Sequence, residues 1–280
     1  MKIFNQCYRV TCRDNLIIDL QNSNGIWYDV GNIDGVFINN WVEGVGNVYE
    51  EYYEGRRYWS GFFFEISKGA ICAGNVFVNC ENGIFVLNSS DVKIYQNTLV
   101  NSVGRIRRTA RNAVSDHFGW HPSTGPDVEE RDGHIFVNNL LTADDNFKDP
   151  LLFVLQPDSL RERLNKQQLK ILDHNVYVRQ SEKDTNSLIL WSPVKNDTCY
   201  LGFESPEDLH KLHSNFSANS KYFAKYKGPL FKSAEQKNYQ LLQGFPGADA
   251  GRVLPDEISK LLNLPTKNIR YIGAYPVKEE

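Results

Sequence analysis

Short alternating runs of apolar and polar residues dominate residues 1–101, and one such run is repeated three times. The copies are Gly25-Ile-Trp-Tyr-Asp-Val, Gly61-Phe-Phe-Phe-Glu-Ile and Gly83-Ile-Phe-Val-Leu-Asn. A second apolar run follows each copy and ends in an asparagine, 14 or 15 residues after the glycine, at Asn40, Asn75 and Asn97. β-Branched and aromatic runs separated by Gly, Asn and Asp are typical of strands and turns, and helical periodicity is absent.

The spacing of these copies predicts a solenoid. Gly61 and Gly83 are 22 residues apart, whereas Gly25 and Gly61 are 36 apart, and we place the excess in an insertion over residues 44–57. A fixed period of 20 to 25 residues made of short strands indicates stacked coils. Because no helix separates the strands and no Leu-x-x-Leu-x-Leu pattern occurs, an all-β fold, a right-handed parallel β-helix, is favoured over a leucine-rich horseshoe.

Six asparagines stand at one point of the repeat, each before a mostly apolar triplet. They are Asn15, Asn40, Asn75, Asn97, Asn139 and Asn175. Stacked asparagine side chains at an inner turn can hydrogen-bond along the stack and so satisfy amides that are costly to bury. We therefore expect this column to be architectural.

The pattern predicts one domain over residues 1–280. Repeating coils fill residues 1–194, with loop insertions at 44–57 and 102–132, and the second insertion is too polar for a strand. Residues 195–280 form the C-terminal coils and a short helical or irregular cap. Helices are predicted after the N-cap Ser205 and at Pro255.

Composition changes this picture little. A net charge of −3 and a pI near 6.1 give no reason to expect a nucleic-acid partner. The five cysteines have no metal-ligand spacing, and no phosphate-binding or dinucleotide motif occurs, so we expect no metal and no cofactor. No apolar run is long enough for a membrane span, and no signal peptide is visible. The chain is expected to be cytoplasmic if complete, and periplasmic or secreted if it is a fragment.

Two carboxylates fall in the same position of the repeat. Strand alternation turns Ile26, Tyr28 and Val30 inward and Trp27 and Asp29 outward. The second copy likewise turns Phe62, Phe64 and Ile66 inward and Phe63 and Glu65 outward. Coils stack about 4.8 Å apart, so Asp29 and Glu65 should be neighbours beside Trp27 and Phe63, whose outward rings could bind the apolar face of a sugar. Paired carboxyls of this kind serve as nucleophile and general acid, and the alternative is two solvated acids screened by Lys or Arg.

The insertions carry further candidates. Residues 44–57 leave the chain between the two acids and could form one wall of a site. His117, Trp120 and His121 could reach the same cleft, with Trp120 as a stacking platform or as an anchor for the loop. The cluster from Arg105 to Arg111 could bind an acidic sugar, or it could be solvated.

The two acidic motifs resemble those of β-helix glycosidases, most closely family 120 of the glycoside hydrolases, the β-xylosidase group. The resemblance covers roughly residues 20–100 and implies a pectate-lyase-like solenoid with Asp29 as nucleophile and Glu65 as acid/base. The chain looks like a C-terminal portion of such a bacterial enzyme, with a longer connection between the motifs. Its open N-terminal end would then be covered by missing coils or by an oligomer contact.

Three functions remain open at this point. The first is a retaining, xylosidase-like hydrolase acting on a plant-type oligo- or polysaccharide. The second is a polysaccharide lyase, whose base and cation would come from Arg105 to Arg111 and His117. The third is a non-catalytic carbohydrate-binding or truncated solenoid. The sequence leaves the sugar, exo or endo action and the oligomeric state open.

Overall fold

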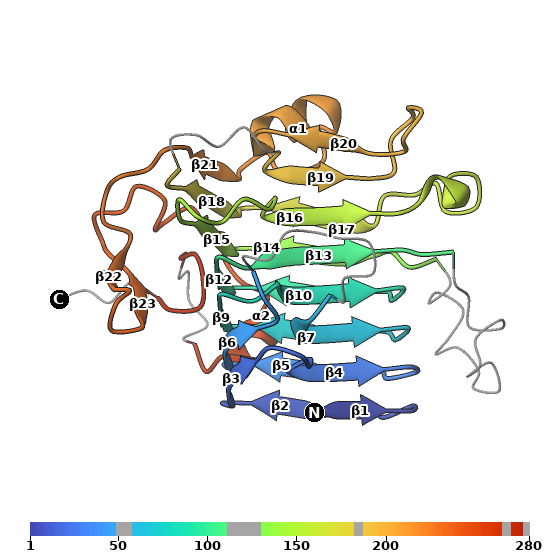
Figure 1. Ribbon diagram of the computed structural model, residues 1–280, viewed down its shortest axis with the longest axis horizontal. Coiled ribbons are helices and arrows are strands. Elements are labelled where there is room, and N and C mark those ends of the chain that lie inside the picture. The colour runs from blue at the N-terminus through green and yellow to red at the C-terminus, as the bar shows by residue number, and fades with distance from the viewer. Residues whose placement is uncertain (49–57, 111–129, 182–186, 265–269, 277–280) are drawn as a thin grey trace.

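The chain places three short strands in each coil and then returns to pair with the strand of the coil before. The computed structural model describes residues 1–48, 58–110, 130–181, 187–264 and 270–276. Within them, nearly every strand pairs in parallel with the equivalent strand of the next coil, and three sheets run the length of the stack (Figure 1). This confirms the predicted all-β solenoid of stacked parallel sheets.

The first sheet faces the viewer in Figure 1 and contains β1 (Lys2–Phe4), β4 (Ile26–Asp29), β7 (Ser60–Glu65), β10 (Asn82–Leu87), β13 (Val103–Arg107), β16 (Leu152–Leu155), β19 (Ile189–Trp191) and the antiparallel β20 (Leu201–Phe203). The second sheet contains β2 (Thr11–Arg13), β5 (Val36–Ile38), β8 (Ile71–Ala73), β11 (Lys93–Tyr95), β14 (His134–Val137) and β17 (Leu169–Asp173). The third contains β3 (Leu16–Leu20), β6 (Trp41–Val45), β9 (Val76–Val78), β12 (Thr98–Val100), β15 (Leu140–Ala143), β18 (Val176–Arg179) and β21 (Lys221–Phe223).

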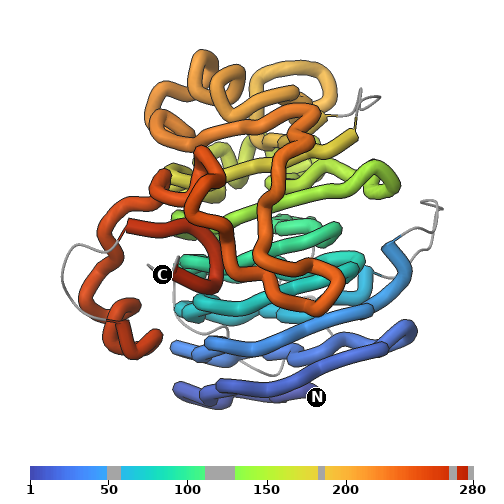
Figure 2. Tube along the Cα trace, turned by 90° about the vertical axis from the view of Figure 1, so that its left-hand side faces the viewer, coloured from blue at the N-terminus to red at the C-terminus, as the bar shows by residue number. Residues whose placement is uncertain are grey.

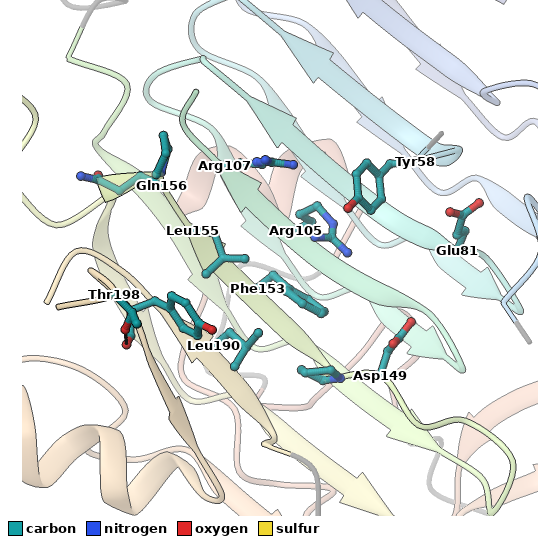
Figure 3. Close-up of a pocket in the computed structure, with 13 residues that line it drawn as sticks. Tyr58, Glu81, Arg105, Arg107, Asp149, Phe153, Leu155, Gln156, Leu190 and Thr198 are labelled. Atoms are coloured by element: carbon teal, nitrogen blue, oxygen red, sulfur yellow. Dashed lines mark hydrogen bonds between the residues drawn. The ribbon is translucent and has the colours of Figure 1, made fainter. Parts of the chain in front are cut away.

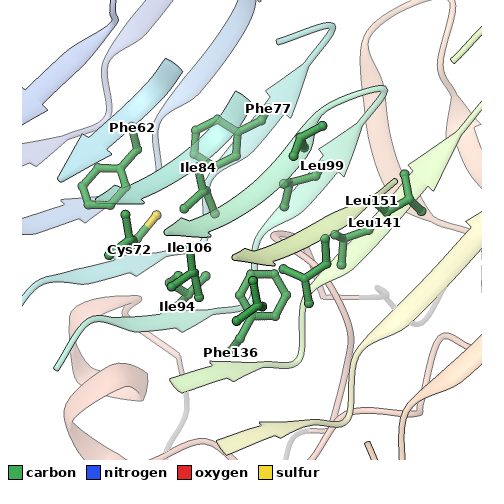
Figure 4. Packing of buried hydrophobic residues seen from close by; sticks show 14 of the residues in the cluster. Phe62, Cys72, Phe77, Ile84, Ile94, Leu99, Ile106, Phe136, Leu141 and Leu151 are labelled. Atoms are coloured by element: carbon green, nitrogen blue, oxygen red, sulfur yellow. The ribbon is translucent and has the colours of Figure 1, made fainter. Parts of the chain in front are cut away.

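Apolar side chains from all three sheets fill the space inside the coils. Phe62 and Ile84 from the first sheet, Ile94 from the second and Phe77 from the third belong to one buried cluster (Figure 4). The glycine that begins each repeat lies where coils approach closely, because a Cβ at Gly25 would come within 2.5 Å of the carbonyl oxygen of the next coil. The inward side chains therefore explain the alternation of apolar and polar residues. The close approach of the coils explains the recurring glycine.

The predicted asparagine column is present as a hydrogen-bonded ladder between the second and third sheets. Each Nδ2 from Asn15 to Asn139 donates to Oδ1 of the asparagine in the next coil, at 2.8 to 3.1 Å. The same Oδ1 accepts the backbone N–H of the preceding asparagine, and Ser220 ends the ladder by accepting the N–H of Asn175. The architectural interpretation is confirmed.

The repeat continues beyond residue 102, where the sequence predicted that an insertion interrupts it. Val103–Arg107 is strand β13, paired with β10 and β16, so the prediction that this segment is too polar for a strand is wrong. Val103 and Ile106 face the core, while Arg105 and Arg107 alternate with them on the outer face. The outward arginines gave the strand its polar composition. Residues 111–129 lie outside the described residues.

The C-terminal part contributes both an end and a flank of the stack. Helix α1 (Pro206–Leu212) lies beside β19 and β20 at the end of the stack, and Ser205 caps it by accepting the N–H of Asp208, as predicted. From Gly228 onward the chain runs back along the coils through the hairpin β22 (Phe231–Ser233) and β23 (Asn238–Leu241) and through α2 (Asp256–Leu261) (Figure 2). A short 3-10 turn, η2 (Asp158–Leu160), follows β16. Among the described helices, none is long and apolar enough to cross a membrane.

The returning segment covers the outer faces of the second and third sheets. Tyr239 packs against Trp41, with ring centroids 5.6 Å apart, and the N–H of Ala274 donates to Thr98 Oγ1 at 2.9 Å. On the second sheet, Arg13 donates to the carbonyl of Leu261 in α2 at 2.6 Å. The described residues of this segment do not cross the first sheet, whose outer face carries the candidate acids of the sequence analysis (Figure 1).

Candidate functional site

Parallel register arranges the outer face of the first sheet into two columns of side chains. The aromatic column, read from β1 to β16, contains Lys2, Trp27, Phe63, Phe85, Arg105 and Phe153. The carboxylate column contains Phe4, Asp29, Glu65, Leu87, Arg107 and Leu155. The intervening Ile26, Tyr28, Phe62 and Phe64 belong to the core cluster, as the alternation predicted. Val30 and Ile66 instead follow the strands with left-handed φ of 42° and 44°, outside that cluster.

Asp29 and Glu65 are direct register partners on β4 and β7. Both are buried, with 3% and 6% of their surfaces exposed, so neither is the solvated surface acid of the alternative interpretation. Lys2 Nζ lies 2.6 Å from Asp29 Oδ2, and Trp27 Nε1 donates to Glu65 Oε2 at 3.1 Å. The two carboxyls therefore sit side by side, one with a lysine countercharge and one held by an indole N–H.

The aromatic column packs ring on ring along the stack. The centroids of Trp27 and Phe63 are 5.3 Å apart with planes at 21°, and those of Phe63 and Phe85 are 4.9 Å apart at 10°. Lys2 Nζ lies 3.9 Å from the centroid of Trp27. Both faces of Phe63 are thus occupied by its neighbours. A stacked pair of this kind stabilises the strand alignment, and only the ring edge of Phe63 is left to face a ligand.

A pocket of about 700 Å³ opens farther along the same face, over β13, β16 and β19 (Figure 3). Its walls combine cations and acids with an apolar floor. Its lining includes Tyr58, Glu81, Arg105, Arg107, Asp149 and Phe153. The candidate acids Asp29 and Glu65 do not line it. The sequence signal that could have located it is Val103-Gly-Arg-Ile-Arg, an alternating strand whose outward positions are both arginine.

Arg105 is held rigidly at the centre of this pocket. Only 7% of its surface is exposed, and its guanidinium lies between the rings of Tyr58 and Phe153, 4.6 and 4.1 Å from their centroids (Figure 3). Its Nε donates to Asn82 Oδ1 at 2.7 Å. Burial lowers the pKa of this guanidinium to about 10, which leaves it positively charged at neutral pH.

The other site residues that the sequence predicted lie in parts of the chain that the structure does not describe. His117, Trp120 and His121 lie outside the described residues, as do residues 49–57 of the first insertion. All five cysteines are free, and Cys7 alone among them is partly exposed. Within the described ranges no three His, Cys, Asp or Glu side chains are grouped as a metal site.

The fold and this face define the chain as an all-β solenoid of stacked parallel sheets with a candidate ligand site on the outer face of its first sheet. Comparison with protein-family models, with curated proteins and with solved structures found no match to the chain.

Proposed function

We propose that the protein is a retaining glycoside hydrolase built on a right-handed parallel β-helix, with Asp29 as nucleophile and Glu65 as acid/base. The observation that supports this is the register pairing of the two carboxyls on β4 and β7. Neighbouring parallel strands are about 4.8 Å apart, which is close to the roughly 5–5.5 Å separation of the carboxyls in retaining enzymes. Parallel crossovers in one sheet are almost always right-handed, which supports the proposed handedness.

In this mechanism Asp29 attacks the anomeric carbon while Glu65 gives its proton to the leaving glycosidic oxygen. The bond to the leaving group breaks as the bond to Asp29 forms, giving a covalent glycosyl-enzyme. Glu65, now ionised, takes a proton from water, and the hydroxyl oxygen displaces Asp29 at the same carbon. Two inversions restore the starting configuration.

The contacts of each acid suit these roles. Lys2 engages Oδ2 of Asp29, and within the described chain Oδ1 makes no hydrogen bond, so Oδ1 is the oxygen available for attack. Lys2 supplies the countercharge that stabilises the ionised nucleophile before reaction. Trp27 positions one oxygen of Glu65 through its indole N–H. Together these contacts hold both carboxyls in fixed positions on strands. Fixed positions lower the entropic cost of reaching the reactive geometry, compared with carboxyls on a mobile loop.

The first test uses an aryl β-xyloside, because the sequence resemblance implies a xylosidase-like, plant-type substrate. Asp29→Asn and Glu65→Gln should each lower kcat roughly 10²- to 10⁴-fold, the usual contribution of a positioned acid, base or nucleophile. The matched control is Glu257→Gln, whose carboxylate is exposed and pairs with Lys93 on another sheet. Unchanged turnover in both site variants would refute the proposal.

A second measurement separates the two roles. Asp29→Ala lacks the nucleophile, so added azide should restore turnover and give a glycosyl azide of inverted configuration. Proton NMR of the wild-type reaction should show the product first released with the configuration of the substrate. First release of the inverted sugar would contradict a retaining mechanism.

A non-catalytic carbohydrate-binding solenoid is the second candidate, and one observation favours it. The Lys2–Asp29 ion pair and the covered faces of Phe63 are what a purely structural column would also contain. Binding of oligosaccharides without turnover would select this candidate. Ultraviolet absorbance from an unsaturated uronate product would instead select the lyase.

A further inference from the structure

We propose that the pocket over β13, β16 and β19 binds an anionic substituent, a carboxylate or a sulfate, on a sugar residue of the ligand, with Arg105 as the anion-binding residue. The presence of a glycan rests on the proposed function, whereas the anion site itself rests on the pocket. The proposal narrows the substrate class from neutral oligosaccharides to acidic ones.

Among the residues that the structure describes, no acid makes an ion pair with the buried guanidinium of Arg105. Burying an isolated guanidinium is costly, so such groups are normally paired with an acid. Within the described ranges Arg105 makes no ion pair, and its one side-chain hydrogen bond uses Nε. The two terminal nitrogens, which carry four N–H groups, are left to face the pocket. Planar donors of this geometry match the two oxygens of a carboxylate or sulfate.

The surroundings hold this guanidinium ready for a ligand. Asn82 fixes Nε, and the rings of Tyr58 and Phe153 sandwich the guanidinium. Little side-chain entropy is therefore lost when an anion binds. Arg107, half-buried two residues along the same strand, lines the pocket and adds a second cation.

The rest of the pocket favours a sugar over a bare inorganic polyanion. Glu81 and Asp149 also line it, so its two acids offset the charge of its two arginines and repel a multiply charged anion. Carboxylates accept hydrogen bonds from sugar hydroxyls, and Thr198 at the rim adds a hydroxyl of its own. Phe153 and Leu190 provide an apolar floor for the carbon face of a ring (Figure 3).

The pocket lies close enough to the proposed reaction site for one oligosaccharide to reach both. Glu65, Leu87 and Arg107 are consecutive register partners in the carboxylate column. Two strand spacings separate Glu65 from Arg107, which is about 10 Å along the stack. An oligosaccharide lying along the stack can therefore reach both places, with its anionic residue near Arg105 and its scissile bond near Asp29.

The test compares three named probes by isothermal titration calorimetry at low salt. They are a glucuronate-substituted xylo-oligosaccharide, a neutral xylo-oligosaccharide of the same length and the same neutral chain carrying one sulfate. We expect the wild type to bind at least one anionic probe roughly tenfold or more tightly than the neutral probe. Arg105→Met should weaken binding of that probe about 10- to 100-fold, the value of a charge-assisted hydrogen-bonded pair, and should weaken binding of the neutral probe much less.

Arg252→Gln is the matched charge control, since Arg252 is exposed on the C-terminal segment. Arg105→Lys, which keeps the charge and loses the planar donor pair, should show a loss smaller than Arg105→Met. If Arg105→Met does not fold, Arg105→Lys and Arg107→Gln provide the same comparison. Equal wild-type affinity for neutral and anionic probes, or an unchanged preference in these variants, would overturn the anion site.

The two proposals fail separately. Asp29→Asn should slow hydrolysis by the factor given above and keep the preference for the anionic probe. Anion preference without any hydrolysis in the wild type would refute the hydrolase and leave the pocket assignment standing. Hydrolysis of neutral xylosides with no anion preference would refute the pocket assignment and leave the hydrolase standing.

Discussion

His134 on β14 shows how one buried side chain makes the stack sensitive to acid. Its surface is 1% exposed, and its Nδ1 accepts the backbone N–H of Val92 at 3.2 Å. Burial, with the nearby Arg108 charge, lowers the pKa of its imidazole to about 3. The folded protein therefore keeps His134 neutral at pH values where an unfolded chain would protonate it.

We expect the free energy of unfolding to fall as the pH is lowered from about 6.5 to about 3. In this window the unfolded state binds one more proton than the folded state at this site, so the slope should reach up to roughly 1.4 kcal/mol per pH unit. Above pH 6.5 the contribution is complete. His134→Asn keeps the acceptor for Val92 and should lose this slope. Urea denaturation at several pH values measures both, and identical slopes would contradict the assignment.

At the scale of elements, the asparagine ladder joins adjacent coils in addition to strand pairing and core packing. Asn97 is fully buried, and its side chain makes hydrogen bonds to the coils on both sides of it. Each amide satisfies a donor and an acceptor that would otherwise be buried without a partner. A substitution in the buried middle of the ladder should therefore lower the free energy of unfolding more than one at its exposed end.

Asn97→Ala should lower the free energy of unfolding by roughly 3 kcal/mol, because it removes the acceptor of the buried Asn75 backbone N–H and both side-chain hydrogen bonds that join residue 97 to the neighbouring coils. Asn15→Ala, at the exposed end of the ladder, is the matched control and should cost less than about 1 kcal/mol. Chemical denaturation of both variants provides the comparison. Equal losses would mean that the ladder does not act through buried amides.

The periodicity of the sequence was sufficient to predict the solenoid, because the same contacts between adjacent coils recur in every repeat. The glycine at each repeat and the asparagine that follows are required by close contacts between coils, so Gly61 and Asn75 could be placed from spacing alone. The strand containing Arg105 was missed because its outward positions are polar and buried by other parts of the fold. Such burial is set by side chains distant in sequence, such as Tyr58 and Phe153, which spacing does not reveal.

For the whole molecule, the C-terminal segment connects distant coils along one flank. Tyr239, on β23, packs against Trp41 of β6 and against Phe231, and Lys237 pairs with Glu43 at 2.9 Å. Solenoid coils normally contact only their neighbours, so a solenoid's stability is close to a sum of local terms. A segment that runs across several coils should make unfolding more cooperative.

Tyr239→Ala tests this coupling. It removes a buried ring over the third sheet and should lower the free energy of unfolding by roughly 2–4 kcal/mol. Trp41 should become more exposed, and its fluorescence should change at a lower temperature than the far-ultraviolet circular dichroism. In the wild type the two signals should coincide. Tyr8→Ala, at a side chain that is 63% exposed, is the control, and the same loss there would contradict the coupling.

Leu87 has a consequence that concerns the direction of ligand entry. It lies between Glu65 and Arg107, which are about 10 Å apart, and the screening length of physiological salt is about 8 Å. Opposite charges this far apart neither neutralise each other nor merge into one potential. The carboxylate column therefore keeps a negative position at Glu65 and a positive position at Arg107, and a chain with one charged terminus that lies along this column would lower its energy in only one of its two orientations. An aliphatic residue at position 87 thus keeps the two charges of this column apart, whereas an acid there would lie beside Arg107 and offset its charge.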